Sequence, residues 1–467
     1  MTVDVQARLL EAFEELVEEA GRRRERTLVS ATAPIGDCDP SAIAFASRRA
    51  DDRWFCWEQP DRDGFALAGV GCAHTVVSRG PVRFEEVVAD CAEVARVRLA
   101  DEPEDAPAGA GPVWVGGFAF SPQGGVEPHW SSLPPALMFL PELAMLRVGD
   151  DAFLTAAAVV APGADPEDAI ASVRKRLASL RGSELPLLDP HLTADTHVRS
   201  LRSPGEFERS VERAVERIAA GELEKVVLAR EILVEAPSAY DPAAVHGVLR
   251  ELFPTCFCFS VGTPEAAFIG ASPELLVRRR GAVAATVALA GSTRRSADPA
   301  VDDHLGEQLL HSDKDRSEHE IVARRIERTL RRHAVWVESA PEPTVIKVAN
   351  IQHLATPIHA QLSEPRSALE LAGLLHPTPA VGGEPRDAAI AAIPELEGID
   401  RGWYAGAIGW MDAAEDGELC VGVRTALLRD RTAHLYAGNG IVGASDPAAE
   451  LAETEIKLDA LLPLLAG

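Results

Sequence analysis

The feature that most constrains the fold is a series of short, apolar, strand-like runs separated by turns and interrupted by a few helical patterns. In the second half of the chain these runs cover residues 224–235, 255–262, 266–271, 274–289, 344–360, 403–412, 417–428 and 432–443. Helical patterns interrupt them near residues 241–253, 314–334, 366–375 and 447–464. Many strands joined by short turns, with a few helices among them, indicate an α+β fold.

The first half of the chain, residues 1–190, mixes the same two patterns. Apolar residues recur at helical spacing over residues 5–23, 83–100 and 165–180. Strand-like runs are RTLVSATA, RWFCWEQ, GFALAGVG, WVGGFAF, residues 136–148 and AFLTAAAVVA. The polar, Pro-containing stretch 181–202 is the best candidate for a domain boundary, and a long crossover within one domain is the alternative.

The second half begins with a helix start signal. Ser203, Pro204 and Glu206 occupy the N-cap, N1 and N3 positions of a capping box. Gly221 predicts that this helix ends at about Ala220, because glycine is the residue that most often follows a helix C-terminus.

The composition is that of a packed globular protein with an acidic surface. Hydrophobic residues make up 46% of the 467 residues, so the chain can bury a large core. The formal net charge of −26 argues against a non-specific nucleic-acid binder and against an electrostatic membrane anchor. An anionic small substrate remains possible, because a local cluster of basic residues and metal can dominate one pocket.

The cysteines and the first residues indicate a cytoplasmic protein. The seven cysteines are scattered without a CxxC pair, which is typical of reduced, mostly buried thiols. Cys256 and Cys258 alternate along one predicted strand, where core packing is favoured over metal binding. Acidic residues interrupt every apolar run near the N-terminus, so we expect no signal peptide and no membrane span.

The predicted C-terminal helix carries three charged residues on one face. Glu450, Glu453 and Lys457 are spaced by three and four residues, which places them together on the helix surface. An ordinary surface salt bridge would explain this spacing. A magnesium site would also explain it, because magnesium prefers a few carboxylate oxygens and completes its shell with water and substrate.

A second source of carboxylates is the segment DKDRSEHEIV. Glu318 and Glu320 flank His319 within a strongly charged helical pattern. A solvated helix face is the alternative to a metal ligand here. Because no second histidine stands at ligand spacing, the segment gives little support to a zinc site.

Five further residues are candidates for chemistry, each with a structural alternative. Lys225 opens an apolar strand and could act as a base from a pocket, or protect a strand edge. Glu274 follows Ser-Pro before an apolar run, where burial would raise its pKa. Arg424 lies in a predicted strand and suits carboxylate recognition if it points inward. Gly438 and Gly440 either let the backbone approach a ligand or form a simple hairpin turn.

Taken together and in order, these segments resemble the chorismate-utilising enzymes. The resemblance covers roughly residues 203–464. It is carried by KVVLAR (225–230), GASPELL (270–276), LAGSTRR (289–295), DKDRSEHEIV (313–322), HLATP (353–357), WYAGAIGW (403–410), VGVRTA (421–426), AGNGIV (437–442) and ELAETEIK (450–457). Nine motifs in the family order make the resemblance specific.

The resemblance implies one large α+β domain in which two mostly antiparallel sheets pack face to face, with helices outside. Residues 1–190 would be the variable half of the family, contributing strands to the same body. Residues 203–464 would form the chorismate-binding catalytic region.

The resemblance also implies roles for individual residues. Lys225 matches the general base and Glu274 the general acid. The magnesium ligands would be Glu318 and Glu453, with Glu450 close by or bound through water. The substrate-binding positions would be Arg424, Gly438, Gly440, Lys457, Tyr404, Ala355, Thr356 and Gly291.

Within this family the residues favour an isochorismate synthase, an isomerase that moves a hydroxyl group around the ring of chorismate. Lys225 stands where ammonia-using members typically carry Gln, and so favours water as the nucleophile. Ala290 stands where aminodeoxychorismate synthases often carry a reactive lysine. Ala355 and Thr356 complete HLAT, where salicylate synthases tend to read HLGS. A salicylate synthase and a catalytically silent relative or regulatory subunit are the alternatives.

The expected partners follow from this assignment. We expect chorismate as substrate, Mg²⁺ as cofactor, no nucleic acid, no membrane and no obligate glutaminase subunit, in a monomer or weak homodimer. The product could serve menaquinone or siderophore biosynthesis, and the sequence does not decide between these pathways.

Overall fold

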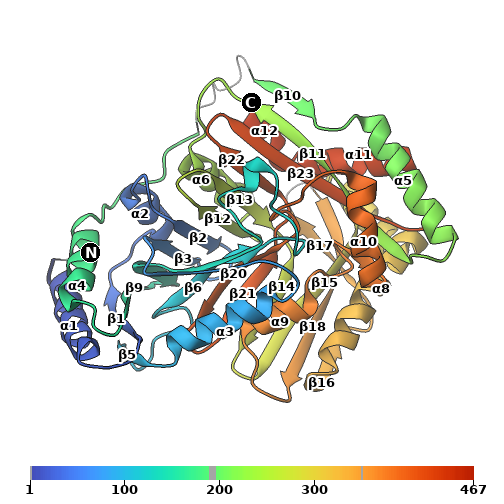
Figure 1. The fold of residues 1–467 in the computed structure, drawn as a ribbon. Helices are drawn as coiled ribbons and strands as arrows, with labels where there is room; N and C mark the ends of the chain where they lie inside the picture. Colours follow the sequence, from blue (N-terminus) through green and yellow to red (C-terminus); the bar gives the residue numbers. More distant parts are fainter. Residues whose placement is uncertain (1–2, 189–195, 349–350) are drawn as a thin grey trace.

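The computed structural model describes residues 3–188, 196–348 and 351–467, and two large β-sheets run through it with helices on their outer faces (Figure 1). The expected α+β class and the two packed, mostly antiparallel sheets are confirmed. Part of the candidate boundary 181–202, the expected end of the first half at residue 190, and two positions of the predicted strand 344–360 lie outside the described residues.

The larger sheet has thirteen strands. In spatial order its main path runs through β10 (His197–Ser200), β11 (Lys225–Glu235), β23 (Thr432–Ile441), β22 (Thr425–Arg429), β13 (Ala267–Ser272), β12 (Phe257–Gly262), β2 (Trp54–Gln59), β3 (Phe65–Val70), β8 (Leu143–Val148), β9 (Asp151–Val160), β1 (Thr27–Ile35) and β5 (Arg98–Asp101). The short β19 (Gly383–Glu384) pairs with β11 beside this path. Among the described strands of both sheets, β1 and β5 form the one parallel pair.

The smaller sheet has ten strands. Its path runs through β16 (Ala334–Ser339), β18 (Ile351–Leu362), β15 (Val283–Arg294), β14 (Leu275–Arg280), β21 (Gly417–Val421), β20 (Ala407–Asp412), β6 (Val113–Phe118), β7 (Ala136–Leu140) and β4 (His74–Ser78). The strand β17 (Thr344–Val348) pairs with β18 beside this path.

The two halves of the chain are joined inside both sheets. In the larger sheet β2 pairs with β12, with Trp57 opposite Phe259. In the smaller sheet β6 pairs with β20, with Gly116 opposite Gly409. Strands from residues 1–190 therefore continue the sheets that residues 203–464 begin, and the backbone hydrogen bonds of the sheets cross from one half to the other.

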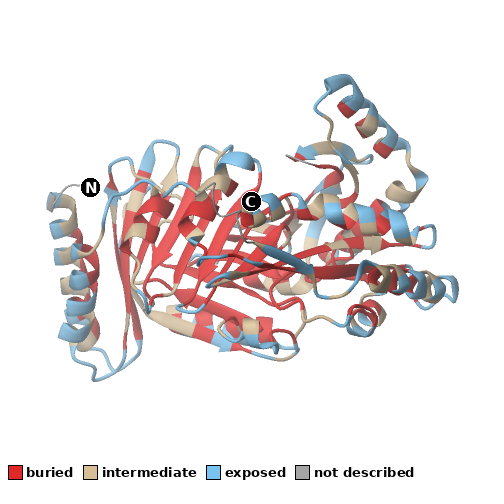
Figure 2. Ribbon diagram, turned by 90° about the horizontal axis from the view of Figure 1, so that it is seen from above, coloured by how far each residue is buried: buried red, intermediate tan, exposed pale blue. Residues whose placement is uncertain are grey.

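The main hydrophobic core lies between the two sheets. Its largest fully buried side chains include Trp57 and Phe259 of the larger sheet and Phe118 and Trp410 of the smaller one. Figure 2 shows the buried residues concentrated on the strands and the exposed ones on the outer helices. Burial of this apolar area, at about 25 cal/mol per Å², is the main term that stabilises the packed sheets.

Helices cover the outer faces of both sheets. Those against the larger sheet are α1 (Val3–Gly21), α2 (Pro40–Ser47), α4 (Pro166–Ala178) and α6 (Pro242–Leu252). Those against the smaller sheet are α3 (Arg83–Ala95), α7 (Pro299–His311), α8 (Asp313–Leu330) and α9 (Ala368–Leu375). Beside β11 and β23 lie α5 (Pro204–Ala219), α10 (Arg386–Glu397), α11 (Pro447–Leu458) and α12 (Leu462–Ala466).

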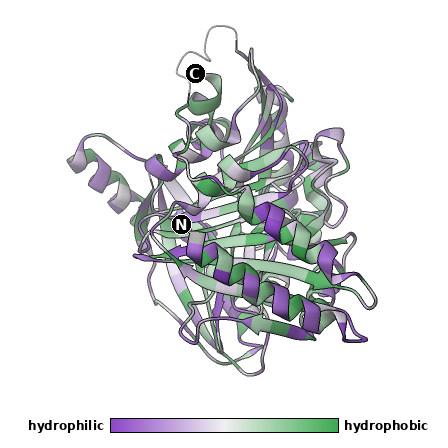
Figure 3. Ribbon diagram, turned by 90° about the vertical axis from the view of Figure 1, so that its left-hand side faces the viewer, coloured by the Kyte–Doolittle hydropathy of each residue, from purple (hydrophilic) through white to green (hydrophobic). Residues whose placement is uncertain are grey.

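The helix α1 illustrates why these helices form where they do. Leu9, Phe13 and Val17 recur at helical spacing and are fully buried against the sheet and α4. Figure 3 shows α1 and α4 with hydrophilic residues along their outer faces. No helix within the described residues combines the length and the apolar character that a membrane crossing requires.

The predicted start of α5 is confirmed. Ser203 and Glu206 form the capping box, and the backbone N–H of Ser203 donates to the Glu206 carboxylate at 2.8 Å. The helix ends at Ala219, and Gly221 adopts a φ of +78° just beyond it.

Several predicted strands are divided in the structure. Residues 136–148 form β7 and β8, which belong to different sheets, because the chain turns at Pro141. The predicted strand 274–289 is a hairpin of β14 and β15 around Gly281, whose φ is +56°. The predicted strand 417–428 is interrupted before Arg424, whose φ of +54° is incompatible with extended backbone.

The predicted free thiols agree with the structure. All seven cysteines are unpaired, and Cys256 and Cys258 are fully buried. Both therefore contribute to packing beneath α6 rather than to a disulfide.

Candidate active site

A pocket of about 730 Å³, open to solvent, lies between the two sheets at the end where β11 and β23 face β15 and β18. The described residues that line it all fall between Val227 and Lys457. They include Glu318 from α8 and Glu453 from α11, so helices as well as strands of both sheets contribute.

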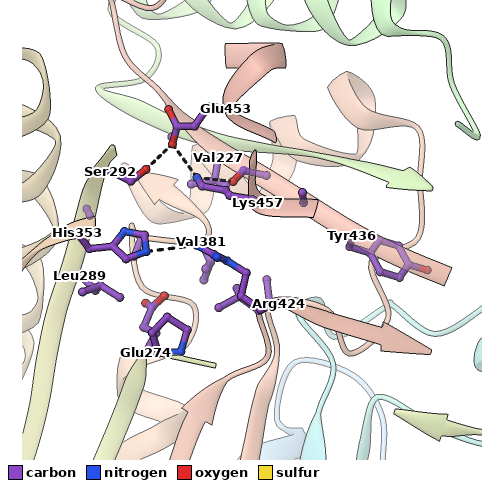
Figure 4. Close-up of a pocket in the computed structure, with 18 of the residues that line it drawn as sticks. Val227, Glu274, Leu289, Ser292, His353, Val381, Arg424, Tyr436, Glu453 and Lys457 are labelled. Atoms are coloured by element: carbon purple, nitrogen blue, oxygen red, sulfur yellow. Dashed lines mark hydrogen bonds and ion pairs between the residues drawn. The ribbon is translucent and has the colours of Figure 1, made fainter. Parts of the chain in front are cut away.

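Glu453 and Lys457 form a fixed ion pair on one wall. The Lys457 ammonium lies 2.9 Å from Glu453 Oε1, and it also donates to the Gly438 carbonyl at 3.0 Å. The Ser292 hydroxyl donates to the same Glu453 oxygen at 2.5 Å. Burial tends to raise the pKa of Glu453, but the charge of Lys457 and the Ser292 hydrogen bond outweigh burial and lower it. The carboxylate is therefore held charged at the pocket wall (Figure 4).

Lys225 lies behind Glu318 at the first residue of β11. Its side chain is fully buried, and its Nζ lies 2.9 Å from Glu318 Oε1. Gly440, on the neighbouring strand, lines the pocket beside this pair. A Cβ at Gly440 would come within 2.0 Å of Glu318 Oε1 and 2.7 Å of Lys225 Cε, so a side chain at this position would collide with the pair.

Glu450 lies one turn before Glu453 but faces away from the pocket. Its side chain is almost fully buried, and Lys314 donates to its Oε1 at 2.6 Å. The Asn439 side-chain amide donates to Glu450 Oε2 at 3.2 Å. Burial is the main cause of the raised pKa of Glu450, and the negative charge of Glu453 adds to it.

Glu274 lies on the opposite side of the pocket from Glu453 in Figure 4. It follows β13, where the Ser272 hydroxyl accepts from the Glu274 backbone N–H at 3.2 Å. Burial raises the pKa of Glu274 to about 8, against the opposing charges of Lys225, Lys457 and Arg424. At neutral pH the carboxyl group is therefore largely protonated and can donate a proton.

Arg424 enters the pocket from the turn between β21 and β22. Its guanidinium donates to His353 Nε2 at 3.3 Å, and both side chains are buried. Burial, followed by the charges of Arg424 and Lys457, lowers the pKa of His353 to about 3, so the imidazole is neutral. The left-handed backbone of Arg424 is uncommon for a non-glycine residue and aims this cation at the pocket.

Two tyrosines complete the pocket. The rings of Tyr404 and Tyr436 stack with centroids 5.2 Å apart. A Cβ on Gly438 would lie 3.1 Å from the Tyr404 hydroxyl and 2.8 Å from the Leu228 carbonyl oxygen, so this glycine lets the strand lie close to the ring. The wall they form is flat and suits a planar or near-planar ring.

The structure brings most of the predicted site residues to this pocket. Lining residues among them are Glu274, Glu318, Glu453, Lys457, Arg424, Tyr404, Gly438, Gly440 and Gly291. Four predicted residues do not line it, namely Lys225, Glu450, Ala355 and Thr356. Thr356 instead contacts His319 Nε2 at 2.7 Å through its hydroxyl.

Some residues of the site were not among the sequence candidates. His353 contacts Arg424, Ser292 contacts Glu453, and Lys314 contacts Glu450. His353 and Ser292 stand in the HLATP and LAGSTRR motifs, so the motifs contained them. Lys314 had no signal of its own, because a lysine in a charged helix resembles any solvated residue.

The glutamates fit a hard divalent cation by their donor chemistry. Glu318 and Glu453 present carboxylate oxygens to the pocket, and magnesium binds proteins through one or two carboxylates with water in its remaining positions. Burial is the first cause of the raised pKa of the neighbouring Asp315, and the charges of Glu318 and Glu453 add to it. A divalent cation would reduce this repulsion.

Comparisons with known proteins agree with this arrangement. The sequence profile of the family described as "Chorismate binding enzyme" matches residues 14–466. The salicylate biosynthesis isochorismate synthase of Pseudomonas aeruginosa is 35% identical over 97% of this chain and 94% of its own length. Isochorismate synthase MenF of Bacillus subtilis is 31% identical over 94% of both chains. The solved structure of MenF, the menaquinone-specific isochorismate synthase from Escherichia coli, superposes with a TM-score of 0.78 at 28% identity, over 98% of this chain and 99% of that one.

Proposed function

The chain belongs to the chorismate binding enzyme family, and we propose that within it the protein is an isochorismate synthase, an isomerase that converts chorismate to isochorismate. Similar proteins with this printed activity match nearly the whole chain. The Pseudomonas aeruginosa relative is named for salicylate biosynthesis and the Escherichia coli structure is described as menaquinone-specific, so together they support a common reaction rather than one pathway.

The observation that carries the proposal is the pair formed by Glu274 and Lys225. Glu274 is a buried carboxyl group with a pKa of about 8, and Lys225 is a fully buried amine beside Glu318, which lines the pocket. Moving a hydroxyl group on a ring requires a proton donor for the departing hydroxyl and a proton acceptor for the attacking water. The two groups supply these functions.

In this mechanism Glu274 donates its proton to the C4 hydroxyl of chorismate as that hydroxyl leaves. Lys225 accepts a proton from the water that attacks C2. The water would reach Lys225 from the pocket side, past Gly440 and Glu318, which both line the pocket. Glu318, at 2.9 Å, stabilises the positive charge that Lys225 gains.

Cationic groups would hold the two carboxylates of the substrate. Arg424 and Lys457 both line the pocket, and Arg424 can bind a carboxylate through two parallel hydrogen bonds. The stacked rings of Tyr404 and Tyr436 would orient the substrate ring between the acid and the base. Binding energy spent on orientation lowers the barrier of the subsequent chemistry.

We propose Mg²⁺ as the cofactor, held by Glu318 and Glu453, with Glu450 supporting the site through Lys314 and Asn439. A bound magnesium ion would polarise the ring carboxylate and draw electrons from the diene. The residues around it orient the substrate and move the protons.

The expected assembly is simple. Because the proposed reaction uses water rather than ammonia, we expect activity without a glutaminase subunit, in a monomer or weak homodimer. The free thiols support a cytoplasmic location.

Product analysis tests the proposal. Purified protein would be incubated with chorismate and Mg²⁺ in the absence of ammonia, with the Lys225→Ala variant as control. Isochorismate without pyruvate is the expected result. Pyruvate together with salicylate would instead identify a salicylate synthase, and a requirement for ammonia would contradict the role of Lys225. No turnover by the parent protein under any of these conditions would favour a silent relative.

A further inference from the structure

A second cluster of potential ligands lies farther along the two strands that carry the pocket. In the pairing of β11 with β23, Val227 lies opposite Gly440 and Glu231 lies opposite Tyr436. Side chains two residues apart on a strand share one face, so Glu231, Tyr436 and His434 continue the pocket face beyond the glycines. Four residues along a strand correspond to about 13 Å, so this cluster is separate from the magnesium glutamates.

The cluster consists of His129, Glu231 and His434. Among the residues that the structure describes, it is the one group of three or more His, Cys, Asp or Glu side chains whose ligand atoms all lie within 4.8 Å of one another. His434 Nδ1 lies 2.7 Å from Glu231 Oε1, and the rings of His129 and His434 stack with centroids 4.2 Å apart. Ligands of a tetrahedral zinc ion, with bonds of about 2.1 Å, lie about 3.4 Å apart, so the ligand atoms would move closer together and the stacked histidine rings would turn as the ion binds.

The segment that carries His129 is held in place by contacts from the second half of the chain. The Asp400 carboxylate accepts from the backbone N–H groups of Gly125, Val126 and Glu127 at 2.9, 2.7 and 3.0 Å. The adjacent Trp130 is fully buried. His129 is thus presented to β11 and β23 by a backbone that is already ordered, which reduces the entropy cost of binding.

Burial and charge at the cluster suit a cation that enters from solvent. Glu231 is buried and His434 nearly so, whereas His129 is half-buried and forms the outer side. The Tyr436 hydroxyl, 3.2 Å from His129 Nε2, offers a hydrogen bond to the site.

We propose that His129, Glu231 and His434 form a binding site for a divalent transition-metal ion of the zinc class, with water in the remaining position. Zinc commonly takes two imidazoles and one carboxylate as ligands, whereas magnesium favours oxygen ligands. The site joins a segment of residues 1–190 to two strands of residues 203–464. It therefore acts as a cross-link between the halves, distinct from the magnesium proposed for the reaction.

Zinc titration of the full-length chain tests the proposal. Chelator-treated protein would be titrated with Zn²⁺ in excess Mg²⁺, which keeps the glutamates of the pocket occupied. Bound zinc would be measured by calorimetry, the melting temperature by calorimetric scanning, and the geometry by the visible spectrum after Co²⁺ substitution. The variants are His129→Ala, Glu231→Gln and His434→Ala. The matched control is His304→Ala, which removes an exposed histidine on α7.

We expect one zinc ion per chain in the parent and in His304→Ala, with a raised melting temperature and a tetrahedral Co²⁺ spectrum. Loss of a group behind a metal ligand already weakens binding about 10–100-fold, so loss of His129 should weaken it at least as much. Turnover of the His129→Ala variant with Mg²⁺ should equal that of the parent. Equal zinc affinity in the parent and His129→Ala, or no zinc binding by the parent, would overturn the proposal. If His434→Ala does not fold, the zinc affinities of His129→Ala, at a half-exposed position, and of the isosteric Glu231→Gln still test the proposal.

Discussion

Residues 1–190 and residues 203–464 build the same two sheets, but they differ in where their charged groups point. The first half supplies six strands of the larger sheet and three of the smaller one, yet the described residues that line the active-site pocket belong to the second half. In the first half the buried charges neutralise each other. Arg176 lies 2.6 Å from Asp52 and 2.8 Å from Glu142.

In the second half buried charges instead border open space. The pairs Lys457–Glu453 and Lys225–Glu318 lie at or just behind the pocket wall. A buried ion pair is a weak source of stability, because desolvation offsets much of the attraction. A buried ion pair beside a cavity therefore indicates a catalytic or binding role, whereas the same kind of pair within packed elements indicates a structural role. Substitutions in the two halves can separate these roles.

The largest effect is expected at Lys225. The variant Lys225→Ala removes the proposed base and should lower kcat about 10³-fold, the usual range for general base catalysis. Magnesium binding should stay close to that of the parent, because Glu318 and Glu453 are retained. Turnover measurement and magnesium titration check both points. The control is Lys347→Ala, which removes an exposed lysine. Full turnover by Lys225→Ala would show that Lys225 is not the base.

The next effect is expected at Glu453. The variant Glu453→Gln removes a proposed metal ligand and the partner of Lys457, so metal and substrate affinity should fall together by about 10–100-fold. The control Glu455→Gln lies on the same helix, with a side chain that is 61% exposed. The magnesium dependence of the rate distinguishes the two variants. If Glu453→Gln retains the parent's dependence, Glu453 is not a ligand.

A smaller effect is expected from pH. Glu274 must be protonated to donate, and its pKa is raised to about 8 by burial. Below pH 8 Glu274 stays largely protonated, so the rate should depend little on its titration. Above pH 8 the protonated fraction, and with it the rate, should fall about tenfold for each pH unit. The pH profile of kcat/KM, which reports the free enzyme, measures this descending limb. The variant Glu274→Gln cannot titrate at this position and should lose both the limb and most of the activity. An unchanged limb in that variant would assign it to another group.

The smallest effect on catalysis is expected in the first half. The variant Asp52→Ala breaks a buried ion pair with Arg176 and should lower the free energy of unfolding by about 3 kcal/mol. The kcat of the folded protein should remain unchanged, because Asp52 does not line the active-site pocket. Denaturant unfolding and turnover below the melting transition test this pair of expectations. A large loss of kcat in folded protein would show that the first half also shapes the site.

The sequence predicted the elements better than their boundaries. The α+β class, the capping box at Ser203 and the strand from Lys225 follow from local periodicity and cap chemistry. The division of residues 136–148 into strands of two different sheets does not, because periodicity reports burial and not the sheet to which a strand belongs. The turn at Arg424 was missed because its neighbours are as apolar as those of a strand.

The same distinction applies to the active site. Helical spacing correctly placed Glu450, Glu453 and Lys457 near one face of α11, but spacing alone could not show that Glu450 faces Lys314 and Asn439. The cluster of His129, Glu231 and His434 had no sequence signal. Its members come from positions more than 100 residues apart, and only the pairing of β11 with β23 and the loop held by Asp400 bring them together.

The continuity of both sheets across the two halves has a consequence for how this chain could be divided. Residues 181–187, just before the second half, are mostly exposed, so a cut there would break little packing. Each resulting fragment would present unpaired strands, β2 and β6 on one and β12 and β20 on the other, in matching register. The unpaired N–H and C=O groups of such strand edges can pair with each other. Co-expressed fragments should reassemble into an active enzyme, which would make the chain a reporter of the proximity of two fused proteins.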